Sequence, residues 1–184
     1  MSVINTDPEV MRWIGGGLVG DEQQTMAAIE TFERRWDQYG FGDLRPGVRA
    51  TGELIGFTGL AVPEFLPEVM PAVEIGWRLG RAFWGRGLAT EAAAAALRFG
   101  LIGRDLGQII SIAQAGNGAS GRIMGKLGMR LARETVDPTC DRPGRVYAAT
   151  KAQHLAAGPR SNGDRTARRH VSVLSGKVWV ACIS

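Results

Sequence analysis

The sequence predicts a mixed α/β fold built on one sheet of about six strands. Strand-like and helix-like segments alternate along the chain, and a Gly-rich turn at residues 80–87 joins a strand directly to a helix. No internal repeat is visible. At 184 residues the chain has the length of one domain with a sizeable core. Its apolar content of 45% and charged content of 22% are ordinary for a soluble globular protein.

The N-terminal part is expected to be helical. Residues Asp7–Trp13 have the pattern of a helix end or an ordered loop, closed by the glycines at 15–17. Apolar residues then recur every three or four positions after Asp21, which predicts one face of a helix that ends at Gly40.

Strands are expected next. Residues 50–53 have the composition of a turn between two strands, the second of which covers Leu54–Val62. Pro46 and Gly47 interrupt the first of them, because proline cannot donate to a strand ladder. Residues 63–71 are expected to form a loop.

The second half alternates strands with helices. A strand at Val73–Leu79 leads through the Gly-rich turn into a helix from about Gly87 to Leu101, whose alanines at 92–96 favour helix strongly. The β-branched run Gln108–Gln114 predicts another strand.

The last elements of the domain are a helix and two strands. The helix opens at Asn117–Ser120, and Gly128 ends it. Strands at Met129–Val136 and Arg145–Thr150 then flank a loop at residues 137–144.

The basic charge is concentrated at the C-terminal end. Residues 158–184 hold five Arg or Lys side chains and one Asp, which equals the formal net charge of +4 of the whole chain. We therefore divide the chain into a domain at 1–157 and a basic tail at 158–184, rich in Gly, Ser and Arg and of unknown role. No aromatic residue lies between Pro159 and His170, so the tail is expected to be disordered rather than an RNA-binding arm.

Several classes of protein are disfavoured. Cys140 and Cys182 form neither a disulfide framework nor a metal-ligand spacing, which predicts two free thiols in a cytoplasmic protein without a metal. No apolar run approaches the roughly 20 residues of a membrane span, and no secretory signal is visible. We therefore expect neither membrane nor nucleic-acid partners.

The Gly-rich turn predicts an anion-binding site. Gly85 and Gly87 would let the backbone approach a phosphate, and Arg86 adds a full charge. The N–H groups that open the following helix lack internal partners and carry partial positive charge. The turn lacks the Lys-Ser/Thr ending of a P-loop, which argues against nucleotide binding.

The segment Glu74–Glu91 resembles the acetyl-CoA motif of the GNAT N-acetyltransferase superfamily. Three further stretches agree in the same order: residues 7–12, 51–59 and 117–129. Within this superfamily, the residues of the motif are most similar to those of the branch that includes ribosomal-protein N-terminal acetyltransferases, the RimJ/RimL type. The resemblance covers about residues 5–151. It implies a splayed mixed sheet with helices on both faces, and acetyl-CoA bound where two central strands part.

The resemblance also implies an activity and a set of cofactor contacts. The activity is transfer of the acetyl group of acetyl-CoA to a primary amine, on a protein N-terminus or a small molecule, by direct attack and without a metal. The backbone of Trp77, Arg78 and Leu79 would pair with pantetheine. The implied pyrophosphate contacts are Gly85, Arg86, Gly87, Leu88, Ala89 and Thr90, and those near the thiol are Asn117 and Ser120.

Glu74 is the candidate general base, directly or through water, with Asp137 and Asp141 as rival bases. Many superfamily members have a tyrosine acid seven residues after the Asn, but this chain has Met124 there, and a thioether cannot donate a proton. Ser120, a bound water or no group at all would serve instead; we favour Ser120.

Other features leave the function open. The resemblance implies a strand and a helix before the equivalent of Asp7, and we expect these to be missing here. The alternative function is therefore a non-catalytic acyl-CoA-binding module with an incomplete acceptor site. The aromatic residues Trp13, Trp36, Phe57 and Trp77 are expected in the core, although one could line the acceptor pocket. Either a monomer or a homodimer is consistent with the sequence.

Overall fold

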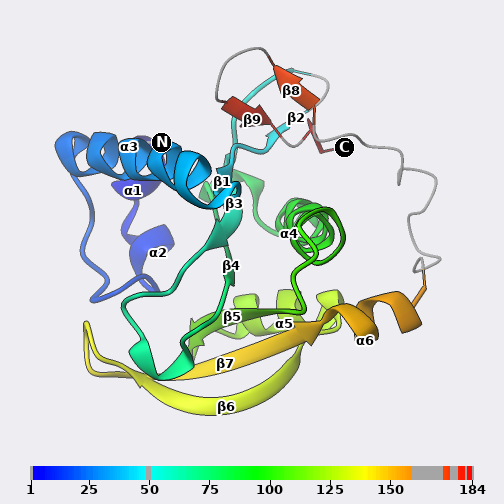
Figure 1. The fold of residues 1–184 in the computed structure, drawn as a ribbon. Coiled ribbons are helices and arrows are strands. Elements are labelled where there is room, and N and C mark those ends of the chain that lie inside the picture. Colours follow the sequence, from blue (N-terminus) through cyan, green and yellow to red (C-terminus); the bar gives the residue numbers. More distant parts are fainter. Residues whose placement is uncertain (1, 49–50, 159–171, 175–177, 181, 184) are drawn as a thin grey trace.

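A mixed sheet of six strands forms the centre of the molecule, in the order β1-β3-β4-β5-β7-β6 (Figure 1). The structure is a computed structural model that describes residues 2–48, 51–158, 172–174, 178–180 and 182–183. The six strands are β1 (Asp43–Leu44), β3 (Gly56–Ala61), β4 (Glu74–Leu79), β5 (Gln108–Gln114), β6 (Arg130–Asp137) and β7 (Arg142–Thr150). The predicted mixed α/β fold is confirmed.

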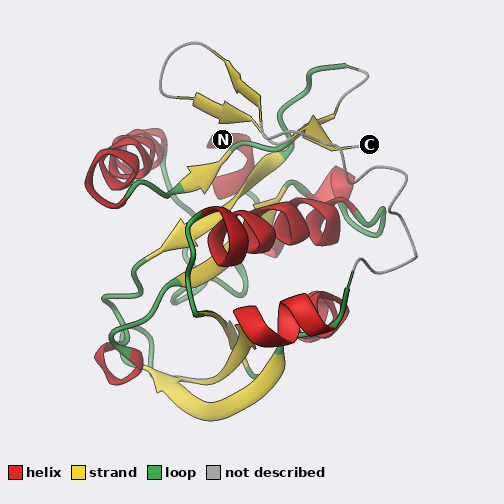
Figure 2. Ribbon diagram, turned by 45° about the vertical axis from the view of Figure 1, so that its right-hand side comes forward, coloured by secondary structure: helices red, strands yellow, loops and turns green. Residues whose placement is uncertain are grey.

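Helices cover both faces of the sheet (Figures 1 and 2). On one side lie α1 (Ser2–Asn5), α2 (Pro8–Met11) and α3 (Glu22–Tyr39); on the other lie α4 (Leu88–Arg98) and α5 (Gly118–Leu127). The short helix α6 (Lys151–Ala156) follows β7. As predicted, α3 begins after Asp21, which forms a capping box with Gln24, and ends at Gly40 in the left-handed conformation. Within the described ranges, no helix is both long and apolar enough to cross a bilayer.

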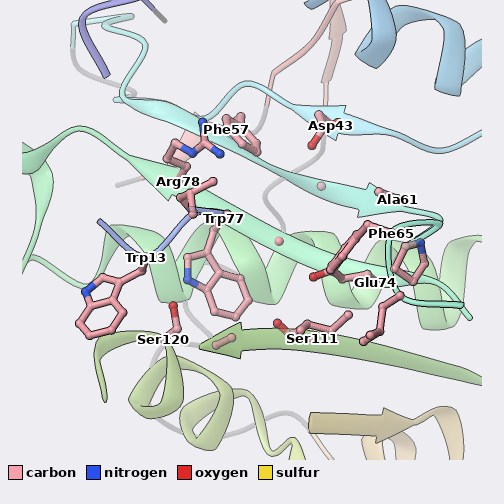
Figure 3. A pocket seen from close by; sticks show the side chains of 18 of the residues that line it. Trp13, Asp43, Phe57, Ala61, Phe65, Glu74, Trp77, Arg78, Ser111 and Ser120 are labelled. Atoms are coloured by element: carbon pink, nitrogen blue, oxygen red, sulfur yellow. The ribbon is translucent and has the colours of Figure 1, made fainter. Parts of the chain in front are cut away.

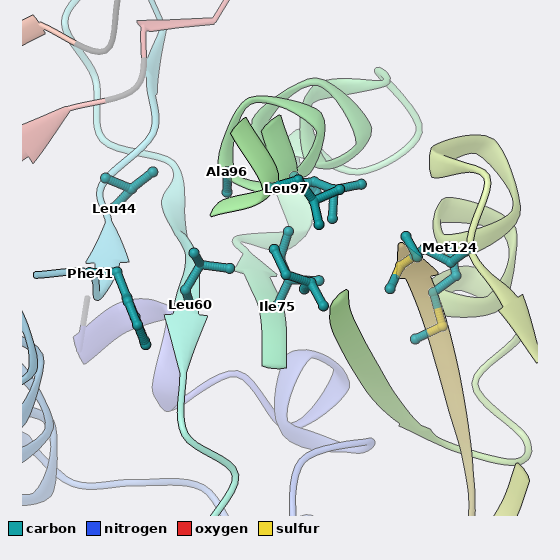
Figure 4. Close-up of a cluster of buried hydrophobic side chains, with 12 residues drawn as sticks. Phe41, Leu44, Leu60, Ile75, Ala96, Leu97 and Met124 are labelled. Carbon is teal, nitrogen blue, oxygen red and sulfur yellow. The ribbon is translucent and has the colours of Figure 1, made fainter. Parts of the chain in front are cut away.

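The main core lies between the sheet and the α4–α5 layer (Figure 4). Leu60 of β3 and Ile75 of β4 are buried against Ala96 and Leu97 of α4, and Met124 of α5 joins them. Alanines on the inner side of α4 let this helix approach the strands closely, so the core is thin and densely packed.

Several element boundaries differ from the predictions. The strand expected from residue 54 begins at Gly56, and the segment before it forms two short strands, β1 and β2 (Gly47–Val48), on either side of Pro46. Helix α4 ends at Arg98 and continues as the π-helical turn η3 (Phe99–Gly103). The expected loop at 63–71 contains the 3₁₀ turn η1 (Pro67–Val69).

The loop expected at residues 137–144 is shorter, because β6 and β7 form a long hairpin that pairs Asp137 with Arg142. Two features close the tight turn. Asp137 accepts a hydrogen bond from the N–H of Thr139 at 2.8 Å, and Asp141 adopts the left-handed conformation with φ of 54°.

Part of the C-terminal segment also differs from expectation. The described residues there form β8 (Ser172–Leu174) and β9 (Val178–Val180), paired antiparallel, and β10 (Cys182–Ile183), which runs parallel to β2. The expectation of a tail without secondary structure is therefore wrong for these residues. Residues 159–171 of the tail lie outside the described part.

The two central strands part near the start of β4. They run parallel, but their ladder holds only the pair Glu74 and Ile110. Beyond this pair, every residue of β4 remains paired with β3, and every residue of β5 remains paired with β7. Each strand thus follows the twist of its own partner, and the edge of β4 from Ile75 to Leu79 faces a gap.

Two glycines leave one face of the sheet bare beside this gap. Gly59 of β3 pairs with Gly76 of β4, and this pair lies between Phe57 with Arg78 on one side and Ala61 with Glu74 on the other. A Cβ atom at Gly59 would lie 2.4 Å from the Cα atom of Asp43, whereas one at Gly76 would meet nothing within 4 Å. Gly59 is thus needed for packing, and Gly76 leaves open space.

We expect the substitutions Gly59→Ala and Gly76→Ala to differ sharply in stability. The first forces backbone atoms of β1 and β3 apart and should lower the free energy of unfolding by about 1–3 kcal/mol or more. The second meets no atom and removes backbone entropy from the unfolded chain, so it should be neutral or slightly stabilising. Urea denaturation of the two variants tests this difference, and equal midpoints would contradict the role of Gly59.

Candidate active site

A cavity of about 460 Å³ opens where β4 and β5 part (Figure 3). Strands β3 and β4 form its floor, β5 and the first turns of α5 form one wall, and the segment after α2 together with α3 covers it. Its polar and charged lining consists of Asn5, Thr25, Arg35, Asp43, Glu74, Arg78, Ser111, Gln114, Asn117, Ser120, Thr135, Asp137 and Thr139. Across the described part of the chain, no group of three or more His, Cys, Asp or Glu could hold a metal ion.

Glu74 lies at the closed end of the fork. It is the last residue of β4 that still pairs with β5, and its carboxylate accepts a hydrogen bond from the backbone N–H of Ile112. Burial raises the pKa of Glu74 to about 7, although that hydrogen bond and the charge of Arg35 act against the rise. A carboxyl group with this pKa exchanges protons near neutral pH, which suits a general base.

The two rival bases are placed less favourably. Asp137 lines the cavity, but the hydrogen bonds from Thr139 outweigh the effect of its burial and hold its pKa below the ordinary value. Its carboxylate is therefore a weak proton acceptor. Asp141 lies in the β6–β7 turn and is not among the residues that line the cavity.

Asp43 is a cavity residue to which sequence reasoning gave no role. It lies on β1 and forms an ion pair with Arg35 of α3 at 3.4 Å. Burial raises its pKa to about 6, and the ion pair with Arg35 opposes that rise. No local pattern could have marked Asp43, because β1 has only two residues and shows no alternation.

The side chain of Arg78 also enters the cavity, whereas the sequence suggested only a backbone role for this residue. Its Nη1 donates to Oδ1 of Asn5 at 2.8 Å, and its guanidinium lies over the ring of Phe57, 5.1 Å from the ring centroid. Asn5 in turn donates to Oγ1 of Thr25 at 3.0 Å. This chain of contacts ties α1 and α3 to the floor of the cavity.

The start of α5 places Asn117 and Ser120 at the cavity wall. Oδ1 of Asn117 accepts a hydrogen bond from the N–H of Ser120 at 3.1 Å and so caps the helix. Ser120 and Trp77 both line the cavity (Figure 3). Met124, one helical turn further, is buried and lines the same cavity.

The aromatic residues expected in the core divide between core and cavity. Trp36 packs against the core, and its Nε1 donates to the carbonyl oxygen of Asp43 at 3.0 Å. Trp13 and Phe57 line the cavity, and Trp77 both lines it and packs against the core. The expectation of a core position thus holds fully only for Trp36.

Polar contacts fix the segment that carries Trp13. Nη1 of Arg142 donates to the carbonyl oxygen of Arg12 at 3.2 Å, and Nη2 donates to that of Gly16 at 3.1 Å. Nε2 of Gln114 donates to the carbonyl oxygen of Gly15 at 2.8 Å. The strands β5 and β7 thereby hold this wall of the cavity in place.

The Gly-rich turn lies beyond the other end of β4. Gly85 and Gly87 have φ angles of 73° and 81°, and a Cβ atom at either would meet nothing within 4 Å. Gly87 precedes α4 without any side-chain cap on that helix, so the first N–H groups of α4 are not taken by a capping side chain. Leu88 is buried, whereas Ala89 and Thr90 are partly exposed. Residues 85–90 do not line the cavity.

Trp84 lies directly before Gly85 in the Gly-rich turn. Its Nε1 donates to the carbonyl oxygen of Leu79 at 2.8 Å, and 46% of the residue is exposed. The indole thus connects the turn to the end of β4.

Comparison with known proteins identifies the family. The model of the acetyltransferase (GNAT) domain matches residues 1–130. The chain belongs to the GNAT acetyltransferase family. Members of this family use acetyl-CoA as acetyl donor, and the chain is accordingly an N-acetyltransferase.

Individual GNAT relatives are similar over most of the chain. The uncharacterised protein YkkB of Bacillus subtilis (strain 168) is 34% identical over 127 residues, which cover 69% of this chain and 72% of YkkB. A GNAT-family acetyltransferase of Bacillus anthracis has 23% identity and a TM-score of 0.67, covering 83% of this chain and 87% of that one. A ribosomal-protein-alanine N-acetyltransferase of Brucella melitensis has 15% identity and a TM-score of 0.63, covering 81% and 90%.

The raised pKa of Glu74 makes a prediction about stability. A carboxyl group whose pKa is higher in the folded state favours folding below its unfolded value of 4.5, and this contribution is lost as the pH rises through about 7. Glu74→Gln has no ionisable group at this position, so its free energy of unfolding does not fall in this way. The difference in stability should therefore shift in favour of the variant as the pH rises from 5 to about 8.5. Urea denaturation at several pH values tests this. Glu30→Gln, on the exposed side of α3, is the control, and a pH-independent difference for Glu74→Gln would contradict the shift.

Proposed function

We propose that this protein transfers the acetyl group of acetyl-CoA to a primary amine, with Glu74 as the general base. The observation that carries the proposal is the fork between β4 and β5, which leaves a strand edge unpaired and places a carboxyl group with a pKa of about 7 at its closed end. An unpaired strand edge accepts an extended ligand through backbone hydrogen bonds. The same fork thus offers a binding edge and a proton acceptor.

The residues present fit acetyl-CoA along this edge. The backbone of Trp77, Arg78 and Leu79 would pair with the pantetheine arm. The open space over Gly85 and Gly87 and the uncapped start of α4 suit a pyrophosphate, which Arg86, Leu88, Ala89 and Thr90 would also contact. Asn117 and Ser120 would lie near the thiol. Acetyl-CoA supplies the thioester carbonyl on which the new amide bond forms.

The catalytic work of the chain is the movement of protons. An amine attacks only in its uncharged form, so Glu74 takes the proton that the acceptor ammonium loses. The pKa of about 7 lets a large share of Glu74 be ionised at neutral pH and still return its proton to water. The hydroxyl of Ser120, in the first turn of α5 at the cavity wall, is our candidate to donate a proton to the leaving thiol.

For the acceptor, we propose a primary amine of a protein N-terminus or of a small molecule. The motifs between Glu74 and Glu91 support the RimJ/RimL type of acceptor, a protein N-terminus. The cavity, at about 460 Å³, has the size of a small-molecule pocket and would admit one or two residues of a peptide end.

Replacement of Glu74 by Gln should lower kcat by roughly 10²–10⁴-fold, the usual contribution of general acid–base catalysis. Affinity for acetyl-CoA, measured by calorimetry, should stay within a few-fold of the wild type, because the strand edge and the Gly-rich turn remain. In the wild type, log kcat/KM should rise with pH and bend near pH 7; the variant should lack this bend. Unchanged turnover in Glu74→Gln would exclude Glu74 as the base.

Replacement of Gly87 by Asp should weaken acetyl-CoA binding by an order of magnitude or more, because a carboxylate would oppose the pyrophosphate at the start of α4. Gly52→Asp is a matched control, since Gly52 also has a positive φ, 69°, with open space around its Cβ position. The Gly52→Asp variant has the same backbone strain and the same added charge as Gly87→Asp, but at a distant position. Equal affinities of the two variants for acetyl-CoA in calorimetric titration would show that the turn does not hold the phosphates.

A further inference from the structure

The two ends of the cavity floor carry opposite charges. Glu74 and Arg78 lie on the same face of β4, with Gly76 between them. No heavy atom lies within 4 Å of the Cβ position of Gly76, so the space between the two side chains is open. Figure 3 shows them well apart within the same pocket. Four residues of extended strand separate their Cα atoms by roughly 13 Å. The floor thus presents a carboxyl group at one end and a guanidinium at the other.

The guanidinium of Arg78 is poorly compensated. Its one hydrogen-bond partner within the described ranges is the neutral side chain of Asn5, at 2.8 Å. Its Nε is buried and has no partner in the described part of the chain. The charge of Asp43 acts on Arg78, but this carboxylate is shared with Arg35 and forms its ion pair there, at 3.4 Å. A partly buried cation with only a shared carboxylate nearby is costly, and a bound anion would offset this cost.

The walls of the cavity suit the same kind of ligand. The ring of Phe57 lies under the guanidinium, and Trp13 and Trp77 also line the cavity. Such a site favours a molecule with an apolar middle and two charged ends. A polycationic acceptor would instead bring its second charge against Arg78.

We propose that Arg78 determines acceptor specificity by binding a carboxylate of the acceptor, whose amine lies at Glu74. The inference rests on the proposed function and names its substrate class: primary amines that carry a carboxylate several bonds from the nitrogen. An α-amino acid such as glycine is too short to reach both ends. The carboxylate belongs either to a small ω-amino acid or to an acidic side chain next to a protein N-terminus.

Three probes of equal length test the proposal: 6-aminohexanoate, its neutral amide and 1,6-diaminohexane. Thiol release from acetyl-CoA should show kcat/KM higher for the carboxylate than for the amide by roughly 10- to 100-fold, as expected for a hydrogen bond to a charged group. The diamine should be the poorest acceptor, and glycine should be no better than the amide. A peptide with glutamate in second position, compared with its glutamine counterpart, tests for a protein N-terminus.

The variant Arg78→Gln should raise KM for 6-aminohexanoate and bring the ratio of its kcat/KM to that of the amide close to one. Arg78→Lys should restore part of the preference. Arg130→Gln, at an exposed position on β6, is the matched control and should behave like the wild type. Thermal melting and acetyl-CoA affinity verify that the Arg78 variants are folded.

The outcomes separate this inference from the proposed function. A preference for 6-aminohexanoate, or for the glutamate peptide, that disappears in Arg78→Gln supports the assignment. Turnover that is equal for all probes, or that falls equally for all of them in Arg78→Gln, overturns it and leaves acetyl transfer intact. Absence of thiol release with every acceptor overturns acetyl transfer itself. Calorimetric binding of 6-aminohexanoate that is equal in wild type and Arg78→Gln overturns the Arg78 assignment without reference to turnover.

Discussion

The separation of β4 from β5 after a single ladder pair is the constraint on which the rest of the structure depends. Each of these strands is held along its full length by its outer neighbour, β3 or β7, so neither can follow the other beyond Glu74 and Ile110. Unpaired backbone groups at a sheet edge must find another partner. The fold therefore contains a gap that only a ligand or water can fill.

The chemistry of the cavity follows from where this fork closes. Glu74 is partly buried there because the strands still pair at this point, and its carboxylate accepts a hydrogen bond from the N–H of Ile112. Burial outweighs that hydrogen bond, so the group titrates near neutrality. The glycine pair Gly59 and Gly76 keeps the adjacent floor bare, and Arg78 gives its far end the opposite charge. In the proposed assignment, proton transfer at Glu74 and acceptor recognition at Arg78 are separated by their positions along one strand.

Much of the fold could be predicted from local sequence signals. Asp21 and Gly40 mark the ends of α3, and the β-branched run of β5 and the alanines of α4 match their elements. The tight β6–β7 turn was missed, because it depends on Asp141 adopting a left-handed conformation that few residues tolerate. The strands of the C-terminal segment were also missed, since each has only two or three residues and β10 pairs with the distant β2.

The site was predictable only where its residues lie in a recognised motif, as Glu74, Asn117 and Ser120 do. Glu74 and the Gly-rich turn belong to such a motif, whereas Asp43 and Asn5 reach the cavity through tertiary contacts with Arg35 and Arg78. The side-chain role of Arg78 was invisible for the same reason. Its partner Asn5 lies 73 positions away in the chain, and no local pattern records such a distance.

The most direct measurement of the central claim is backbone hydrogen exchange with and without coenzyme A. If the open edge of β4 and the start of α4 hold the cofactor, amides at residues 76–79 and 86–90 will exchange more slowly when coenzyme A is bound. Residues 130–133 of β6, on the far edge of the sheet and outside the cavity lining, will exchange at an unchanged rate. Protection confined to other segments, with no change at the fork, would contradict the assignment of the fork as the cofactor site.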